Sequence, residues 1–108
     1  MTWVRSAFWI GSAKPGQEDA FRDGIENVIM PGLRKLPAVR GADVLWPRRF
    51  EPGGPEIACQ IVVELDSVEA IDAMLASPER MALRKDVLKV VELFDGSFSH
   101  IDFELGAV

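Results

Sequence analysis

The only histidine of this chain, His100, lies in the segment SFSHIDFEL, two residues before Asp102 and four before Glu104. Histidine changes its charge near neutral pH, so a lone histidine close to two acids suggests acid–base chemistry. Ser97 and Ser99 in the same segment suggest a second option, a serine nucleophile activated by the histidine. Which of these groups can meet depends on the secondary structure that carries them.

Alternating and helical patterns along the chain predict that structure. Strands are predicted over residues 2–10, 42–46, 56–65 and 97–105, which are rich in β-favouring residues that alternate between two faces. A first helix is predicted over residues 16–36, with a kink or break at Pro31. A second helical segment is predicted after a capping box of Asp66 with Glu69, with a fresh start at Ser77.

The resulting order of elements is βαββαβ. Four strands and two helical segments in this order predict an α+β fold of the ferredoxin-like type. In that fold a four-stranded antiparallel sheet of order 4-1-3-2 carries both helices on one face. A chain of 108 residues is long enough for one such domain, spanning residues 1–108, and too short for two.

Successive side chains of a strand point to opposite faces of the sheet, and this alternation limits which reactive groups can meet. The apolar faces of the third and fourth strands are expected to lie under the helices, which puts Ser97 and Ser99 on the helix side and His100 with Asp102 on the other. A Ser-His-Asp triad is therefore excluded. Cys59 belongs to the apolar face of its strand, so a Cys-His dyad is excluded as well, and Cys59 is predicted to be a buried apolar thiol.

Arg5 is the cation expected next to the histidine. In a sheet of order 4-1-3-2 the first strand lies between the fourth and the third, so Arg5 would face His100 or Asp102 on one side and Gln60 or Glu64 on the other. Two interpretations are open. The charges form an ion-pair lattice, or His100 and Arg5 are catalytic residues in a cavity.

A ligand has two candidate positions in this fold. Trp46, Phe8 and Ile29 are expected to line an apolar pocket between the sheet and the first helix, together with Cys59 and Phe103, unless these side chains simply fill the core. The other position is the opposite face of the sheet, where Trp9 is expected beside Arg5 and His100.

The face of the sheet away from the helices is also expected to carry Trp3, Trp9 and Phe98 among charged residues. Aromatic patches of this kind usually mark a partner surface. We therefore expect a homodimer that closes through this face into an α/β barrel.

Composition excludes several other classes of function. A net charge of −5 argues against a nucleic-acid partner, because binding phosphates requires clustered Lys and Arg. One Cys and one His supply neither a disulfide framework nor a conventional zinc site, and no glycine-rich phosphate loop is present. The apolar runs are far shorter than the ~20 residues of a membrane helix, and the first residues lack the layout of a signal peptide. We expect a cytoplasmic protein without membrane contact, metal or other cofactor.

Four segments carry a family resemblance: KPGQEDAF, MPGLRKLPAVRGADV, VVELDSVEAIDAMLASPE and VVELFDGSFSHIDFEL. They resemble the dimeric α/β barrel superfamily and, within it, the EthD-like branch, which is close to the antibiotic-biosynthesis monooxygenase and muconolactone-isomerase-like branches. The resemblance covers nearly the whole chain. It implies a homodimer whose two sheets pack face to face, with pockets for hydrophobic or aromatic compounds, and several relatives need no metal or cofactor.

The chain departs from the EthD-like pattern in its first helix. Relatives commonly have a His-x-Pro sequence there, whereas this chain has Ile29, Met30 and Pro31, and it contains no tyrosine to hold a phenol. The missing helical histidine also argues against haem degradation. Two hypotheses follow: a cofactor-independent monooxygenase, cyclase or isomerase, or a non-catalytic dimer that binds a ligand or serves as an accessory subunit.

Overall fold

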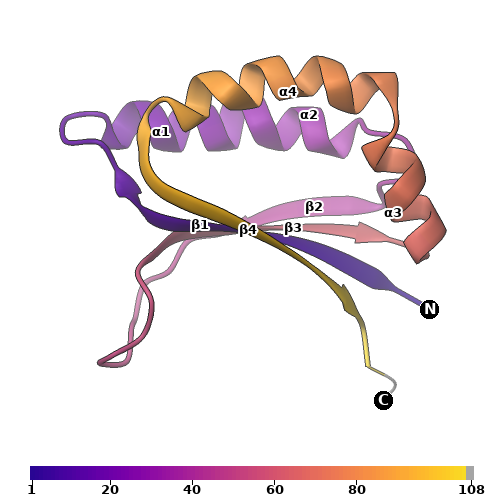
Figure 1. Ribbon diagram of the computed structural model, residues 1–108, viewed down its shortest axis with the longest axis horizontal. Helices are drawn as coiled ribbons and strands as arrows, with labels where there is room; N and C mark the ends of the chain where they lie inside the picture. The colour runs from indigo at the N-terminus through magenta and orange to yellow at the C-terminus, as the bar shows by residue number, and fades with distance from the viewer. Residues whose placement is uncertain (107–108) are drawn as a thin grey trace.

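In the computed structural model, which describes residues 1–106, a four-stranded sheet lies under a layer of helices on one of its faces (Figure 1). The strands are β1 (Trp3–Ala13), β2 (Gly41–Leu45), β3 (Ile57–Leu65) and β4 (Phe94–Glu104). The helical segments are α1 (Glu18–Gly24), η1 (Ile25–Ile29), α2 (Met30–Arg34), α3 (Val68–Leu75) and α4 (Pro78–Val91). The sheet order β2-β3-β1-β4, with every neighbour antiparallel, confirms the predicted ferredoxin-like fold.

The register of the central strand β1 decides which side chains share a face of the sheet. Residues directly opposite each other on neighbouring strands point to the same side. Arg5 lies opposite Val63 and Asp102, Ala7 opposite Ile61 and His100, and Trp9 opposite Cys59 and Phe98. From Cys59 onward, the odd-numbered residues of β3 are buried in the core between sheet and helices. Arg5, Trp9 and His100 therefore lie on the helix side.

This register corrects the predicted orientation of two strands. Trp3, Trp9 and Phe98 were expected on the face away from the helices, and they lie on the helix side instead. That opposite face, called the open face below, is formed by Val4, Phe8, Gln60, Val62, Ile101 and Phe103. The orientation of β3, with Gln60 and Val62 on the open face, is as predicted.

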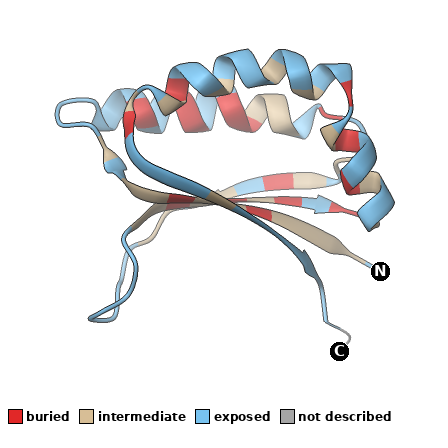
Figure 2. Ribbon diagram, viewed as in Figure 1, coloured by how far each residue is buried: buried red, intermediate tan, exposed pale blue. Residues whose placement is uncertain are grey.

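The physical reason for the error is that β4 is an edge strand. The helices cover it incompletely, and Figure 2 shows it exposed along most of its length. Its helix-side residues are therefore partly polar, whereas its apolar residues Ile101 and Phe103 lie on the open face. A prediction from polarity alone therefore exchanges the helix side and the open-face side of β4.

A pair of glycines permits the close approach of β1 and β4. Gly11 and Gly96 lie opposite each other with φ angles of 130° and 154°. A Cβ atom at Gly96 would clash with the carbonyl oxygen of Ile10, and one at Gly11 with that of Asp95. Only glycine combines these backbone angles with this lack of space.

The sequence predicted a kink or break at Pro31; the structure shows no break there, and the irregularity takes the form of a π-helical turn just before the proline. Proline lacks an N–H, so in a regular helix the carbonyl four residues earlier would lose its partner. A turn of wider π-helix, η1, precedes it, and within it the N–H of Met30 donates to the carbonyl of Ile25. Pro31 then lies in the first turn of α2, where an intrahelical donor is not required.

The starts of the later helices agree with the sequence to within one residue. Ser77 caps α4, which begins at Pro78 as predicted. The cap of α3 is Ser67 rather than Asp66. The Asp66 carboxylate instead accepts a hydrogen bond from Arg40 at 3.0 Å.

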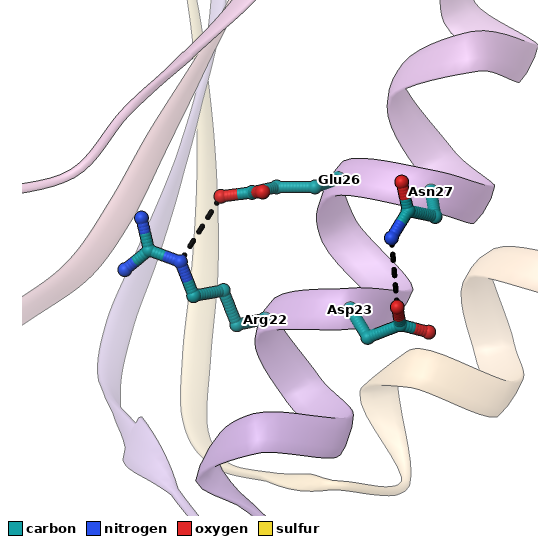
Figure 3. A network of polar contacts seen from close by, with 4 residues as sticks. All are labelled: Arg22, Asp23, Glu26 and Asn27. Carbon is teal, nitrogen blue, oxygen red and sulfur yellow. Dashed lines mark hydrogen bonds and ion pairs between the residues drawn. The ribbon is translucent and has the colours of Figure 1, made fainter.

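Exposed side chains of the first helix form two separate polar pairs (Figure 3). Arg22 Nε donates to Glu26 Oε1 at 3.0 Å, and Asn27 Nδ2 donates to Asp23 Oδ1 at 2.7 Å. Exposed pairs at this spacing stabilise a helix by roughly 0.2–0.5 kcal/mol each. The Arg22 guanidinium also lies 4.4 Å from the ring centroid of Trp46. These contacts fix the helix surface and leave its other side to the core.

In the part of the chain that the structure describes, each helix is too short or too polar to span a bilayer.

Candidate functional site

A cavity of about 290 Å³ lies between the helix side of the sheet and the helices above it. Its apolar lining includes Ala7, Trp9, Ile29, Ile61, Leu83 and Val87. These residues come from β1, β3, η1 and α4, so all layers of the fold contribute. The volume is close to the lower end of the range for small-molecule pockets, about 300 Å³.

An aromatic cluster lies at one end of this cavity. The ring of Trp9 contacts those of Phe21 and Phe94 edge-on, with centroids 5.4 Å apart in each case. Phe98 lies 4.7 Å from Trp9 in the same manner and also lines the cavity. Edge-to-face packing of this kind holds the rings in fixed orientations. Trp9 therefore presents a rigid aromatic wall.

Arg5 and His100, the predicted catalytic candidates, line this same cavity. They project from neighbouring strands toward the helices. Arg5 Nη1 lies 2.9 Å from Asp102 Oδ1, in a partly buried ion pair. This contact confirms the predicted approach of Arg5 to Asp102. The prediction that Gln60 or Glu64 lies on the other side of Arg5 is wrong, because both residues point to the open face.

His100 lies in an environment that disfavours its charged form. Partial burial lowers the pKa of His100 below its ordinary value of 6.5, and the positive charges of Arg5 and Arg80 lower it further, whereas Asp102 opposes them. The lowered pKa therefore favours the neutral form of the His100 imidazole at pH 7. A neutral imidazole at a cavity wall can accept a proton from a bound molecule.

Two residues of α4 that the sequence analysis missed complete the polar part of the lining. Arg80 and Arg84 are one helical turn apart and line the cavity beside Leu83 and Val87. Their positions continue the helical spacing of the apolar residues that face the sheet. That spacing is a sequence signal that could have placed both arginines on the inner side of the helix.

Cys59 shares the helix side with His100, which corrects the prediction that they lie on opposite faces. The two still cannot form a dyad, because β1 runs between their strands and neighbouring strands are about 4.8 Å apart. Cys59 is fully buried, as predicted, and burial raises the pKa of its thiol to about 12. A thiol in that state is not a nucleophile near neutral pH.

The serines and the histidine of β4 lie on opposite faces of the sheet, as predicted, but each lies on the face that was predicted for the other. Ser99 lies opposite Phe8 on the open face, while His100 points to the helices. A Ser-His-Asp triad is therefore absent from the described strand.

The predicted ligand-binding residues do not form one group. Trp9 and Ile29 line the cavity, but Phe8 points to the open face on the other side of the sheet. Trp46 lines a second cavity of about 410 Å³, between the open face and the β2–β3 connection. Its indole N–H is buried without a hydrogen-bond partner among the residues described. The helix-side cavity thus combines residues from both predicted positions.

Among residues 1–106, no three side chains of His, Cys, Asp or Glu gather in a way that could hold a metal ion.

The fold and the cavity define a ferredoxin-like α+β protein with an apolar pocket under its helices. No protein-family model matches the sequence, and no curated protein sequence matches it significantly. Solved structures do match. A protein of the EthD (ethyl tert-butyl ether D) family from Bacillus halodurans has a TM-score of 0.77 at 20% identity, covering 98% of this chain and 100% of its own.

Two further structures give the same result. A dimeric ferredoxin-like protein of unknown function from Jannaschia has a TM-score of 0.68 at 13% identity, covering 95% of this chain and 99% of its own. A protein from Bordetella bronchiseptica, provisionally assigned as an antibiotic biosynthesis monooxygenase, has a TM-score of 0.66 at 17% identity, covering 99% and 100%. At these identities the likeness establishes the shared fold, in agreement with the resemblance seen in the sequence.

The electrostatic environment of His100 yields a testable prediction. In Arg5→Gln the pKa of His100 should rise, because a positive charge that lowers it is lost and Asp102, which raises it, is no longer paired. NMR titration of the single imidazole measures this directly. The matched control is Arg40→Gln, which removes an arginine paired with Asp66 at the surface and should leave the pKa of His100 unchanged. An unchanged or lower value in Arg5→Gln would contradict the described geometry.

Proposed function

We propose that the protein binds a small hydrophobic or aromatic organic compound, without metal or nucleotide, in the cavity between α4 and the sheet. The observation that carries the proposal is the composition of the lining, which is apolar except for a few convergent polar groups. That combination is typical of small-molecule sites. The similar fold of the Bordetella bronchiseptica protein, provisionally assigned as an antibiotic biosynthesis monooxygenase, supports a ligand of this kind.

Filling the cavity should weaken binding. We choose the neutral two-ring probe 2-naphthalenemethanol, measured by calorimetry. Val87→Trp places an indole in the cavity and should weaken binding about tenfold or more, since the probe would lose most of its buried area. Met81→Trp adds the same side chain at an exposed position of α4 and should change nothing. Equal affinities for both variants, or no binding by the unaltered protein, would refute the proposal.

We also propose a homodimer formed through the open face. Ile101 and Phe103 are 44% and 43% exposed there, although such side chains on a sheet are ordinarily covered. The β2–β3 connection, residues 46–56, extends from the sheet on the side away from the helices, with Phe50 exposed on it (Figure 1). The sheet of a second copy, packed on the open face between β4 and the β2–β3 connection, would complete an α/β barrel. The Jannaschia structure, described as dimeric, supports this arrangement.

The dimer predicts a mass near twice the 11.9 kDa of one chain in light scattering. Phe103→Glu should give a monomer, because a charge buried between two sheets has no partner to offset its desolvation. Met81→Glu makes the same kind of exchange on the helix layer and should remain dimeric. A monomeric unaltered protein, or a dimeric Phe103→Glu variant, would show that the open face is not the interface.

Conversion of the ligand is a second candidate function, favoured by the neutral His100 at the cavity wall. The protein would then be a cofactor-independent monooxygenase, cyclase or isomerase. Its His100 imidazole would take a proton from a carbon of the ligand that lies next to a carbonyl group. Arg5 and Arg80 would stabilise the negative charge left on the oxygen.

Proton exchange tests this second candidate. With 2-tetralone in heavy water, the protein should accelerate the replacement of the acidic C1 protons by deuterium, and NMR records the rate. His100→Ala should lose this acceleration while still binding 2-naphthalenemethanol. If the variant exchanges deuterium as fast as the unaltered protein, His100 is not a base and the binding function stands alone.

A further inference from the structure

The charged side chains that line the helix-side cavity are all arginines. Arg5, Arg80 and Arg84 line it together with His100, and no acidic residue does so within the part of the chain described. The whole chain carries a net charge of −5, so this local excess of cations is opposite to the character of the protein. A random distribution of its surface charges would favour acids.

The cations differ in whether the protein already neutralises them. Arg5 is paired with Asp102 at 2.9 Å. Arg80 and Arg84 make no ion pair among the described residues, unlike the surface arginines Arg22 and Arg40. The arginines of α4 therefore have charge available for a ligand.

The two arginines of α4 lie next to the apolar lining of the cavity. They lie one turn apart on the side of α4 that also presents Leu83 and Val87 to the cavity. The charge of Arg80 also reaches His100, on the strand below, and lowers the pKa of that imidazole. The cations thus lie along one rim of an apolar chamber. The proposed dimer interface, on the open face, leaves them uncovered.

From this arrangement we infer that the ligand is an amphipathic organic acid. Its compact apolar body occupies the cavity against Trp9 and Val87, and its carboxylate binds Arg80 and Arg84 at the rim. Guanidinium groups bind carboxylates with directed, charge-assisted hydrogen bonds, which are stronger beside an apolar surface than in open water. The inference rests on the proposed binding function and adds the chemical class of the ligand to it.

The test compares two probes with the same rings, 2-naphthoate and 2-naphthalenemethanol, by calorimetry at pH 7.5. The unaltered protein should bind the acid about tenfold more tightly than the alcohol, the gain expected from hydrogen bonds to a charged group. The double variant Arg80→Gln/Arg84→Gln should lose this preference and bind the two probes with equal affinity. The control Arg48→Gln/Arg49→Gln removes two exposed arginines outside this cavity and should keep both affinities.

A variant that binds the acid more tightly gives a stronger test, because a misfolded protein would bind it less tightly. Asp102→Asn removes a negative charge beside the cavity residue Arg5, so the affinity for 2-naphthoate should rise several-fold because its carboxylate meets less like-charge repulsion, while the affinity for the alcohol stays the same. Equal binding of both probes by the unaltered protein, with no effect of the α4 variant, would overturn the organic-acid inference and leave the binding function intact. Binding of neither probe would overturn the binding function itself.

Discussion

The pairing of β1 with both of its neighbours is the constraint on which the rest of this structure depends. A shift of one residue in a strand register turns every side chain to the other face of the sheet. In the observed register Arg5, Ala7 and Trp9 point toward the helices, and so does His100 across from Ala7. Where β1 and β4 approach each other closely, the facing glycines Gly11 and Gly96 leave no room for a side chain. The site under the helices exists because this register holds.

The same register separates two surfaces with different chemistry. On the helix side, buried residues of β3 and the helices surround a chamber whose rim carries Arg80 and Arg84. On the open face, Ile101 and Phe103 are exposed. A ligand with one charged end suits the first surface, and a second copy of the chain suits the second. The proposed ligand site and the proposed dimer interface therefore do not share residues.

The sequence was sufficient for the fold but not for the sidedness of two strands. Element order and apolar spacing identified the four strands, the sheet order and the cap of α4, because these features depend on local patterns. The orientations of β1 and β4 could not be obtained in that way. Both faces of β1 carry aromatic residues, and the apolar side of an edge strand such as β4 packs against a partner as readily as against a helix. The pairing of Arg5 with Asp102 was predictable since it is the same on either face.

The site was predicted in fragments for the same reason. His100, Arg5, Trp9 and Ile29 were each singled out, but on two different faces, and the arginines of α4 were overlooked because helix surfaces usually carry solvated charges.

A crystal structure of the protein soaked with 2-naphthoate tests the central claim most directly. The account predicts the rings beside Trp9 under α4, with the carboxylate in contact with Arg80 or Arg84. Density for the probe on the open face or beside Trp46, with the helix-side cavity empty, would contradict it.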